Sequence, residues 1–273
     1  MNTDKEKQNL CLTVLGARGS MPGEGRDFAI FGGSTSCYRI MAGNEEIYLD
    51  AGSGIAGAIP EQNTNITVLL THMHLDHLVG LPFFSALTHK DRHIDIYGLP
   101  RDGLTPQEAV DRLITPPFWP AKIADYPANV KFHLLPDSAF FLGNVSVDMM
   151  EGNHPGGSTI FRLTYGDKSI VYATDFEHLV ASECDALADF SRETSLLLYD
   201  AQYTQEEYAR YKGYGHSTPE TGMEIFANSK AKKLLMVHHA PWRKDEEILR
   251  MEEKFKRENV NIAFAKIGDE FIL

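Results

Sequence analysis

The sequence predicts an α/β fold in which two packed β-sheets are flanked by helices. Short runs rich in Val, Ile, Leu and Tyr, bounded by Gly, Asn or Pro, dominate the first half of the chain and continue into the second, a pattern typical of strands. Segments with helical spacing fall between and after these runs. Many strands with helices outside them favour two layered sheets over a doubly wound parallel sheet.

The strand-like runs extend from the start of the chain almost to its end. They are residues 12–15, 37–41, 46–50, 66–71, 94–97, 130–135, 145–150, 159–164, 169–173 and 196–199. The apolar run 234–237 has the same character, and we expect a last strand at residues 261–266 to close the fold.

Three segments are predicted as helices. The first is residues 106–114, where Thr105 can cap the helix and Pro106 suits its first position. The second is residues 219–228, where Thr218 and Pro219 have the same roles. Residues 245–258 are charged and amphipathic, with apolar side chains at helical spacing: Ile248, Met251 and Phe255.

Composition indicates a soluble globular protein. The 273 residues are 43% hydrophobic and 23% charged, and we expect them to form one domain covering residues 1–273. No apolar run approaches the roughly 20 residues of a membrane helix. The first residues, MNTDKEKQNL, are polar and lack the apolar core of a signal peptide. We therefore expect a cytoplasmic protein with no membrane partner.

Charge and cysteine content narrow the classes of partner and site. A net charge of -12 repels polyanions, which argues against a large nucleic-acid partner, although a metal cluster can still bind a small anion. The three cysteines form no close pairs, which argues against a disulfide framework or a cysteine zinc site. We interpret Cys11, Cys37 and Cys184 as buried structural thiols.

Two segments are predicted as functional loops. Residues 16–33 are rich in glycine and have no periodicity. Residues 115–128 contain four prolines besides Phe118 and Trp119. Proline lowers the entropy lost on ordering a loop, so this loop either covers a pocket or docks its two aromatic side chains into the core.

The most informative segment follows the strand-like run 66–71. Four potential metal ligands occur within six positions: His72, His74, Asp76 and His77. His72 and His74 lie two residues apart, so in extended backbone they point to the same side. Imidazole and carboxylate together suit zinc, manganese or iron. We therefore predict a metal site at the end of this strand.

One such cluster cannot complete two metal sites, so other residues must contribute. His154 lies in a glycine-rich turn between strands, Asp175 follows the run 169–173, and His238 and His239 follow the run 234–237. We prefer His238 to His239 because it stands directly at the strand end, but the sequence alone leaves both open. The remaining histidines without this context are interpreted as surface or supporting residues: His89, His93, His133 and His178.

These residues resemble the metallo-β-lactamase superfamily. Residues 72–77 match its H-x-H-x-D-H signature, and the match continues in order through His154, Asp175 and His238. The glycine-rich segments at residues 15–20, 33–36 and 50–54 are also similar to this superfamily. Ser158 after His154, and the segment 215–218, resemble the branch that contains ribonuclease Z and small phosphodiesterases.

The resemblance implies an αββα sandwich with two divalent metal ions at one edge of the sheets. It implies that one ion is bound by His72, His74 and His154, that the second is bound by three further ligands, and that Asp175 bridges them. Those further ligands are Asp76, His77 and His238. Zinc, manganese and iron all occur in the family.

The resemblance also implies a hydrolytic mechanism. Two ions about 3.5–4 Å apart lower the pKa of a bridging water, and the resulting hydroxide attacks the substrate. Asp76 would orient that hydroxide, and His216 is our candidate general acid, with a plain loop histidine as the alternative. Asp50 is expected to orient the ligand imidazoles, and Asp200 to support the site.

The leading hypothesis is a phosphodiesterase acting on a small or cyclic nucleotide-type phosphodiester. The alternative is a carboxyl-ester, lactone or thioester hydrolase on the same metal site, with an apolar pocket that Phe118 and Trp119 help to line. A sensor without catalysis is disfavoured by the complete ligand set. A long basic arm of the kind that ribonuclease Z uses to bind transfer RNA is not evident. Relatives are often dimers, and we leave a homodimer open.

Overall fold

The computed structural model describes residues 9–62 and 65–273, so most of the N-terminal segment considered above, residues 1–8, lies outside the described residues. The first sheet has the order β14-β1-β2-β3-β4-β5-β6. Its strands are β14 (Glu270–Ile272), β1 (Leu10–Gly16), β2 (Cys37–Ala42), β3 (Glu45–Leu49), β4 (Asn65–Leu69), β5 (His93–Gly98) and β6 (Asn129–Leu134). The neighbours from β14 to β3 are antiparallel, and those from β3 to β6 are parallel.

The second sheet has the order β13-β12-β11-β10-β9-β8-β7. Its strands are β13 (Ile262–Phe264), β12 (Leu234–Val237), β11 (Leu196–Asp200), β10 (Lys168–Ala173), β9 (Ser158–Tyr165), β8 (Val145–Gly152) and β7 (Phe140–Leu142). The neighbours from β13 to β10 are parallel, and those from β10 to β7 are antiparallel. Both sheets are therefore mixed.

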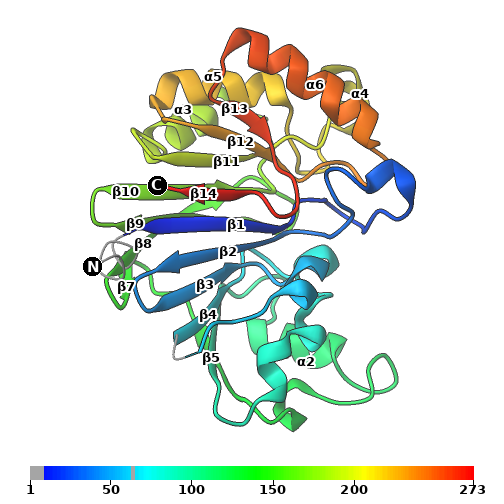
Figure 1. The fold of residues 1–273 in the computed structure, drawn as a ribbon, viewed down its shortest axis with the longest axis vertical. Coiled ribbons are helices and arrows are strands. Elements are labelled where there is room, and N and C mark those ends of the chain that lie inside the picture. The colour runs from blue at the N-terminus through cyan, green and yellow to red at the C-terminus, as the bar shows by residue number, and fades with distance from the viewer. Residues whose placement is uncertain (1–8, 63–64) are drawn as a thin grey trace.

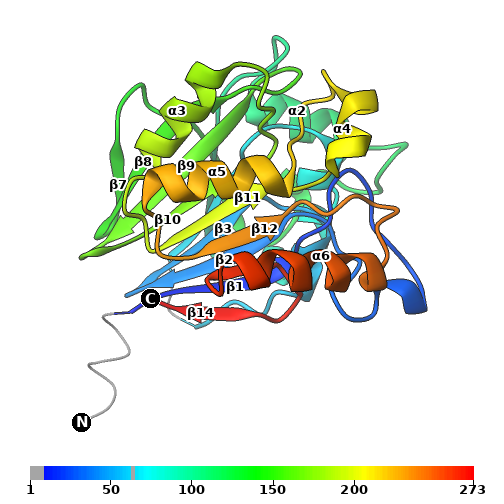
Figure 2. The same cartoon turned by 90° about the horizontal axis from the view of Figure 1, so that it is seen from above.

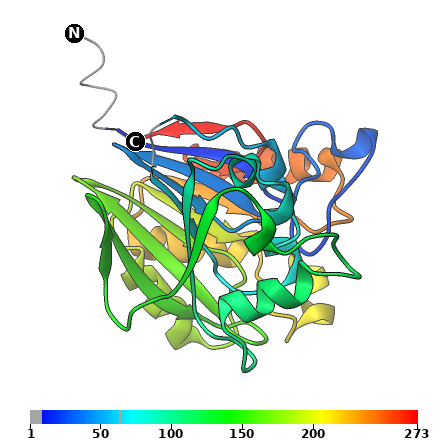
Figure 3. The same cartoon turned by 90° about the horizontal axis from the view of Figure 1, so that it is seen from below.

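Helices cover the outer faces of the stacked sheets, which confirms the predicted αββα arrangement (Figure 1). Figure 2 shows α3, α5 and α6 over the second sheet, and Figure 3 shows α2 on the opposite side of the molecule. The α-helices are α2 (Pro106–Leu113), α3 (Ala181–Phe190), α4 (Gln205–Tyr211), α5 (Pro219–Ser229) and α6 (Asp245–Glu258). Short 3₁₀ helices are η1 (Arg26–Phe28), η2 (Ser53–Gly57), η3 (Leu75–His77), η4 (Leu81–Phe83), η5 (Ser85–Thr88) and η6 (Ile123–Asp125).

The layering explains why the central strand β11 is buried along its whole length. All five residues of β11 are buried, because Leu196 and Leu198 face the first sheet whereas Leu197 and Tyr199 face the helices. In β1, by contrast, buried and half-buried positions alternate. A strand with both faces covered loses the alternation that marks a half-exposed strand.

The predicted helix starts are confirmed in detail. The Thr105 side chain accepts a hydrogen bond from the Glu108 backbone N–H, and the Glu108 carboxylate accepts one from the Thr105 backbone N–H, which forms a capping box. Thr218 accepts from the Thr221 backbone N–H at the start of α5. Each cap satisfies a backbone donor that would otherwise lack a partner at the helix start.

The prediction that residues 261–266 end the fold is wrong. β13 is followed by β14, which pairs with β1 in the other sheet. The helices α3 and α4 and the strand β7 were not predicted. A three-residue strand such as β14 or β7 depends on its partner strand. α3 begins after Val180 without a side-chain cap, and α4 has only seven residues, so neither has both a start signal and a long periodic pattern.

The loop at residues 115–128 follows one of its two predicted alternatives, docking into the core, and only through Trp119. Trp119 packs against Phe83 with ring centroids 4.9 Å apart, and its indole N–H donates to the Tyr126 hydroxyl. Trp119 also adjoins the core between α2 and the first sheet. Phe118, however, remains 77% exposed. The tryptophan therefore docks, while the phenylalanine neither docks nor lines a described pocket.

The cysteines are free thiols, as expected, but only Cys37 is buried, and Cys11 and Cys184 are half-buried. Across residues 9–62 and 65–273, no helix has both the length and the apolar character needed to cross a membrane.

Candidate metal centre

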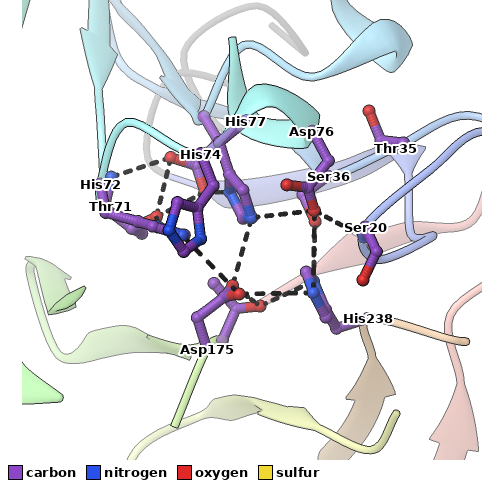
Figure 4. Close-up of polar contacts among 12 residues, drawn as sticks. Ser20, Thr35, Ser36, Thr71, His72, His74, Asp76, His77, Asp175 and His238 are labelled. Carbon is purple, nitrogen blue, oxygen red and sulfur yellow. Dashed lines mark hydrogen bonds and ion pairs between the residues drawn. The ribbon is translucent and has the colours of Figure 1, made fainter. Parts of the chain in front are cut away.

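The predicted ligands meet at one edge of the sandwich, where strands of both sheets end. His72 follows β4 in the first sheet, and Asp175 and His238 follow β10 and β12 in the second. His154 lies in the connection between β8 and β9. Figure 4 shows side chains from both sheets converging on Asp175. The strand-end pattern in the sequence therefore predicted a real spatial cluster.

Three buried imidazoles share one feature that hydrogen bonding within the protein does not explain. The Nε2 atoms of His72, His77 and His238 are buried and have no hydrogen-bond partner among the described residues. A buried polar atom without a partner costs about 1–3 kcal/mol, so folded proteins rarely retain one without a use. Three such atoms in one cluster fit a bound cation.

The opposite nitrogen is held in place in four of the five predicted ligand imidazoles, all except His74. The Nδ1–H of His77 donates to the Asp50 carboxylate at 2.7 Å, and the Nδ1–H of His154 donates to the Gly215 carbonyl at 2.9 Å. His72 and His238 place Nδ1 within 3.1 Å of hydroxyl oxygens, from Thr71 for the first and from Ser36 and Thr174 for the second. Each bond orients its ring and leaves the Nε2 lone pair toward the centre, an arrangement common around protein metals.

Asp175 lies at the middle of the cluster. Its carboxylate oxygens are 3.3 Å from Nε2 of His77, 3.4 Å from Nε2 of His238, 3.8 Å from Nε2 of His154 and 3.9 Å from Nε2 of His72. The side chain is buried. A carboxylate with imidazoles on both sides is placed to bridge two ions.

Asp76 is positioned by the glycine-rich loop of residues 16–33. Its Oδ2 atom accepts the backbone N–H of Ser20 at 2.7 Å and lies 3.3 Å from Nε2 of His77. Next to Ser20, a Cβ atom on Gly19 would come within 2.4 Å of the imidazole of His238. This loop was predicted to be functional, but no sequence pattern indicated the particular contacts that Ser20 and Gly19 make.

The donors divide into groups that match the chemistry of a borderline metal. His72, His74 and His154 form one group, and Asp76, His77 and His238 form another, with ligand atoms within 4.8 Å of one another in each. His72, His77 and Asp175 connect the two. Mixed imidazole and carboxylate donors suit zinc, manganese and iron, so the residues present fit two divalent ions.

A further group overlaps these sets. Asp175, Asp200, His216 and His238 also place ligand atoms within 4.8 Å of one another. His216 is therefore placed to act either as a metal ligand or as a proton donor.

Burial decides the charge state of most imidazoles in the cluster. It lowers the pKa of His72, His74 and His238, and neighbouring imidazoles add to this effect. Neutral imidazole is the form that binds metal. His77 is the exception: burial alone would lower its pKa, but the carboxylates of Asp76, Asp175 and Asp50 raise it well above its ordinary value. These carboxylates favour positive charge at the position of His77, which a bound cation would supply.

Backbone strain is concentrated at the same place. Ser20, Asp50, Asp175 and His238 have φ angles of 62°, 60°, 53° and 60°, in the left-handed region that residues other than glycine seldom adopt. Such conformations persist where surrounding contacts enforce them, and they gather at functional sites. Asp50 and His238 directly follow β3 and β12, and Asp175 lies two residues after the end of β10.

His216, the predicted general acid, lies beside the cluster and is held by Asp200. Its Nδ1–H donates to the Asp200 Oδ2 atom at 3.0 Å. The same oxygen accepts the Asp175 backbone N–H at 3.0 Å, and the other oxygen accepts the Ser217 backbone N–H at 3.1 Å. Asp200, predicted to support the site, thus joins the central carboxylate to the His216 loop.

The loop that carries His216 is fixed by a residue that the sequence did not single out. The buried Glu177 carboxylate accepts the backbone N–H groups of Gly213 and Gly215 at 2.6 and 2.8 Å. Gly215 in turn offers its carbonyl to His154. Glu177 follows no strand directly and belongs to no motif, so only the three-dimensional contacts reveal it.

Replacing Gly215 with alanine is expected to displace His154 and to lower metal content. Gly215 has φ of 89°, and an added Cβ would lie 2.1 Å from His154 Nδ1 and 2.4 Å from Pro155 Cδ. Gly213→Ala is the matched control, because φ is 92° but nothing lies within 4 Å of its Cβ. The control should lose only stability, on the order of 1 kcal/mol. Equal metal content in both variants would contradict the role of Gly215.

The structure distinguishes the two neighbouring histidines that the sequence left open. His238 faces the cluster, whereas His239 Nε2–H donates to the Ala265 carbonyl at 2.8 Å, away from it. His238→Ala should therefore lower the number of bound ions per chain, measured by elemental analysis, and His239→Gln should not. The reverse result would assign the ligand to His239.

The other histidines stay outside the cluster, as expected. His89 and His93 are exposed, and His133 forms an ion pair with Asp95 at 2.6 Å. His178 contacts the Ser217 hydroxyl at 2.7 Å, close to the His216 loop.

Comparison with known proteins extends these findings. A family model described as Beta-lactamase superfamily domain matches residues 46–239. The ribonuclease Z of Bradyrhizobium sp. (strain ORS 278) is 23% identical over 261 residues, covering 77% of this chain and 85% of that protein. The uncharacterized protein Rv1339 of Mycobacterium tuberculosis (strain H37Rv) is 27% identical and covers 87% and 84%. The ribonuclease Z of Pyrococcus horikoshii is 40% identical over 72 residues, but the match spans only 26% of this chain and 21% of that protein.

Solved structures share the fold over nearly the whole chain. The metallo-β-lactamase fold protein YhfI from Bacillus subtilis has a TM-score of 0.74 and 21% identity, covering 97% of this chain and 100% of that one. A diphosphatase from the PhnP family has a TM-score of 0.70 and 17% identity, covering 97% of both. CmlA, a diiron β-hydroxylase from Streptomyces venezuelae, has a TM-score of 0.58 and 10% identity, covering 97% of this chain and 54% of that one. At these identities the likeness concerns the fold alone.

Proposed function

The chain belongs to the metallo-β-lactamase superfamily, and from this premise we propose that it is a dinuclear metal-dependent hydrolase that cleaves small phosphodiesters. The observation that carries the proposal is the set of buried, unpartnered Nε2 atoms of His72, His77 and His238. The fold alone would not suffice, because the CmlA β-hydroxylase has it too.

The proposed ligands follow the donor groups. His72, His74 and His154 bind the first ion, and three others bind the second: Asp76, His77 and His238. Asp175 contributes to both. Zinc and manganese are the leading candidates, and iron suits the same donors. When bound, two such ions activate water and offset the charge that develops on the attacked phosphate.

The chain's own residues supply the remaining parts of the reaction. The backbone N–H of Ser20 fixes the Asp76 carboxylate, so that it can accept a hydrogen bond from the attacking water. Asp50 and Gly215 orient the rings of His77 and His154. These contacts hold the site in a fixed geometry before the substrate arrives, which is the main source of rate enhancement in such centres.

His216 donates a proton to the leaving oxygen. Burial alone would lower the pKa of the His216 imidazolium, but the charge of Asp200 and its hydrogen bond raise it above the ordinary value. A raised pKa keeps the imidazole protonated near neutral pH, as a general acid requires. Since Nδ1 is bound to Asp200, Nε2 is the nitrogen that would reach the substrate.

A small phosphodiester suits the surface better than a large nucleic acid does. The net charge of -12 repels polyanions. Tight binding of a nucleic acid depends on basic side chains that displace the counterions of its phosphates. Relatives named ribonuclease Z and a neighbour named as a diphosphatase support chemistry at phosphorus without fixing the substrate.

We retain carboxyl-ester hydrolysis only as one outcome of the assay with chromogenic esters. It called for an apolar pocket lined by Phe118 and Trp119, but Trp119 docks on Phe83 and Phe118 is 77% exposed. No described contact favours a carboxyl ester.

A panel of chromogenic esters tests the proposal. The protein loaded with zinc or with manganese is assayed on bis(p-nitrophenyl) phosphate and on p-nitrophenyl acetate. Turnover of the phosphodiester well above that of the acetate is expected. Efficient acetate cleavage with little phosphodiester cleavage would instead assign the site to carboxyl-ester chemistry.

A further inference from the structure

An aromatic cluster extends outward from His216 and has no role in the chemistry described so far. It consists of Tyr203, Tyr211, Tyr214 and Trp242, and we call it the aromatic rim. Tyr203 meets the His216 ring edge-on, with centroids 5.7 Å apart. Tyr203 then stacks on Tyr211 at 5.0 Å with an interplanar angle of 21°. The rim therefore begins in contact with the proposed general acid.

The outer members of the rim are exposed to solvent. Tyr214 is 62% exposed and lies 5.7 Å from Tyr211, and Trp242 is 46% exposed and lies 5.9 Å from Tyr211. Clustered exposed aromatic surface often marks a binding site rather than a fold requirement. Its position beside the metal centre makes the substrate the occupant to consider first.

The rim is preorganised. The Trp242 indole N–H donates to Glu207 at 3.2 Å, and Glu207 also pairs with the buried Arg243, so the indole plane is fixed. Tyr214 lies between the two glycines whose backbone N–H groups are bound by Glu177. Rings held in this way lose little entropy when a ligand stacks on them.

We propose that Tyr211, Tyr214 and Trp242 bind the base of a nucleotide-type phosphodiester by stacking while its phosphate lies at the metal centre. The proposal rests on the proposed function and adds the part of the substrate that the rim recognises. A base offers a flat π face to such rings, and stacking supplies affinity to a protein whose net charge disfavours binding by phosphate contacts alone.

The first test compares two substrates with the same leaving group. Thymidine 5′-(p-nitrophenyl phosphate) and methyl p-nitrophenyl phosphate both release p-nitrophenolate, but only the first carries a base. The ratio of their kcat/KM values should fall about 5- to 100-fold in Trp242→Ala and in Tyr214→Ala. Tyr214→Phe keeps the ring and should keep the ratio.

Phe118→Ala is the matched control, because Phe118 is exposed and is absent from the described ring contacts of the rim. It should leave the ratio unchanged. Tyr214→Ala guards against a folding artefact in Trp242→Ala, since Tyr214 is the more exposed of the two. An unchanged ratio in Tyr214→Ala and Trp242→Ala would overturn the proposal.

A binding measurement separates this proposal from the proposed function. The chain has two tryptophans, so Trp119→Phe leaves Trp242 as the only tryptophan. In this variant of the metal-loaded protein, adenosine 5′-monophosphate should quench Trp242 fluorescence at concentrations at which ribose 5-phosphate does not. Quenching without any ester hydrolysis would support the rim and reject the phosphodiesterase. Hydrolysis without quenching, or equal quenching by both ligands, would reject stacking at the rim.

Discussion

Asp175→Ala is expected to remove most of the bound metal and to abolish measurable phosphodiester hydrolysis. The Asp175 carboxylate lies within 3.9 Å of Nε2 atoms of imidazoles in both donor groups. Without it, both donor groups lose the carboxylate that would bind an ion in each of them. Metal content by elemental analysis and turnover of bis(p-nitrophenyl) phosphate on the same preparation measure the two losses.

Two controls make the Asp175 result specific. Asp167→Ala removes a carboxylate whose side chain is 86% exposed and should retain both metal and activity. His72→Ala should cost metal as well, because the unpartnered Nε2 of His72 is in the first donor group. Full metal content in Asp175→Ala would mean that Asp175 does not bridge the site.

His216→Ala is expected to lower phosphodiester turnover by about 10²–10⁴-fold while bound metal stays unchanged. The deficit should grow as the leaving group becomes more basic, because a poor leaving group depends more on the proton that His216 donates. Asp200→Asn should act in the same direction, since Asp200 holds His216 Nδ1. Steady-state kinetics over a series of aryl phosphodiesters measure this dependence.

The metal content of His216→Ala shows whether His216 is a metal ligand or a proton donor. If His216→Ala loses an ion, then Asp175, Asp200, His216 and His238 form the second site, and His216 is a ligand. If metal is retained but the deficit is the same for all leaving groups, His216 orients the substrate without donating a proton. His89→Ala, at an exposed histidine, should change neither quantity.

Local sequence signals predicted most of the centre. Four donors within residues 72–77, and further candidate donors after three other apolar runs, were predicted from the residues, and the family resemblance then divided them between two ions. The caps of α2 and α5 could also be predicted from neighbouring residues, because Thr105 and Thr218 contact residues three positions ahead.

The parts that sequence could not predict depend on contacts between distant residues. Glu177 is bound to Gly213 and Gly215, 36 and 38 positions away, and Ser20 is bound to Asp76, 56 positions away. The choice between His238 and His239 depended on which way a single residue turns at a left-handed φ of 60°. β14 depended on pairing with β1 near the other end of the chain.

The most direct test of the account is the number of metal ions on purified protein, followed on the same sample by turnover of bis(p-nitrophenyl) phosphate with added zinc or manganese. We expect close to two ions per chain, together with hydrolysis that a chelator removes and added metal restores. Protein that binds no metal tightly, and that added metal does not activate, would contradict the central claim that these buried imidazoles and carboxylates form a dinuclear catalytic centre.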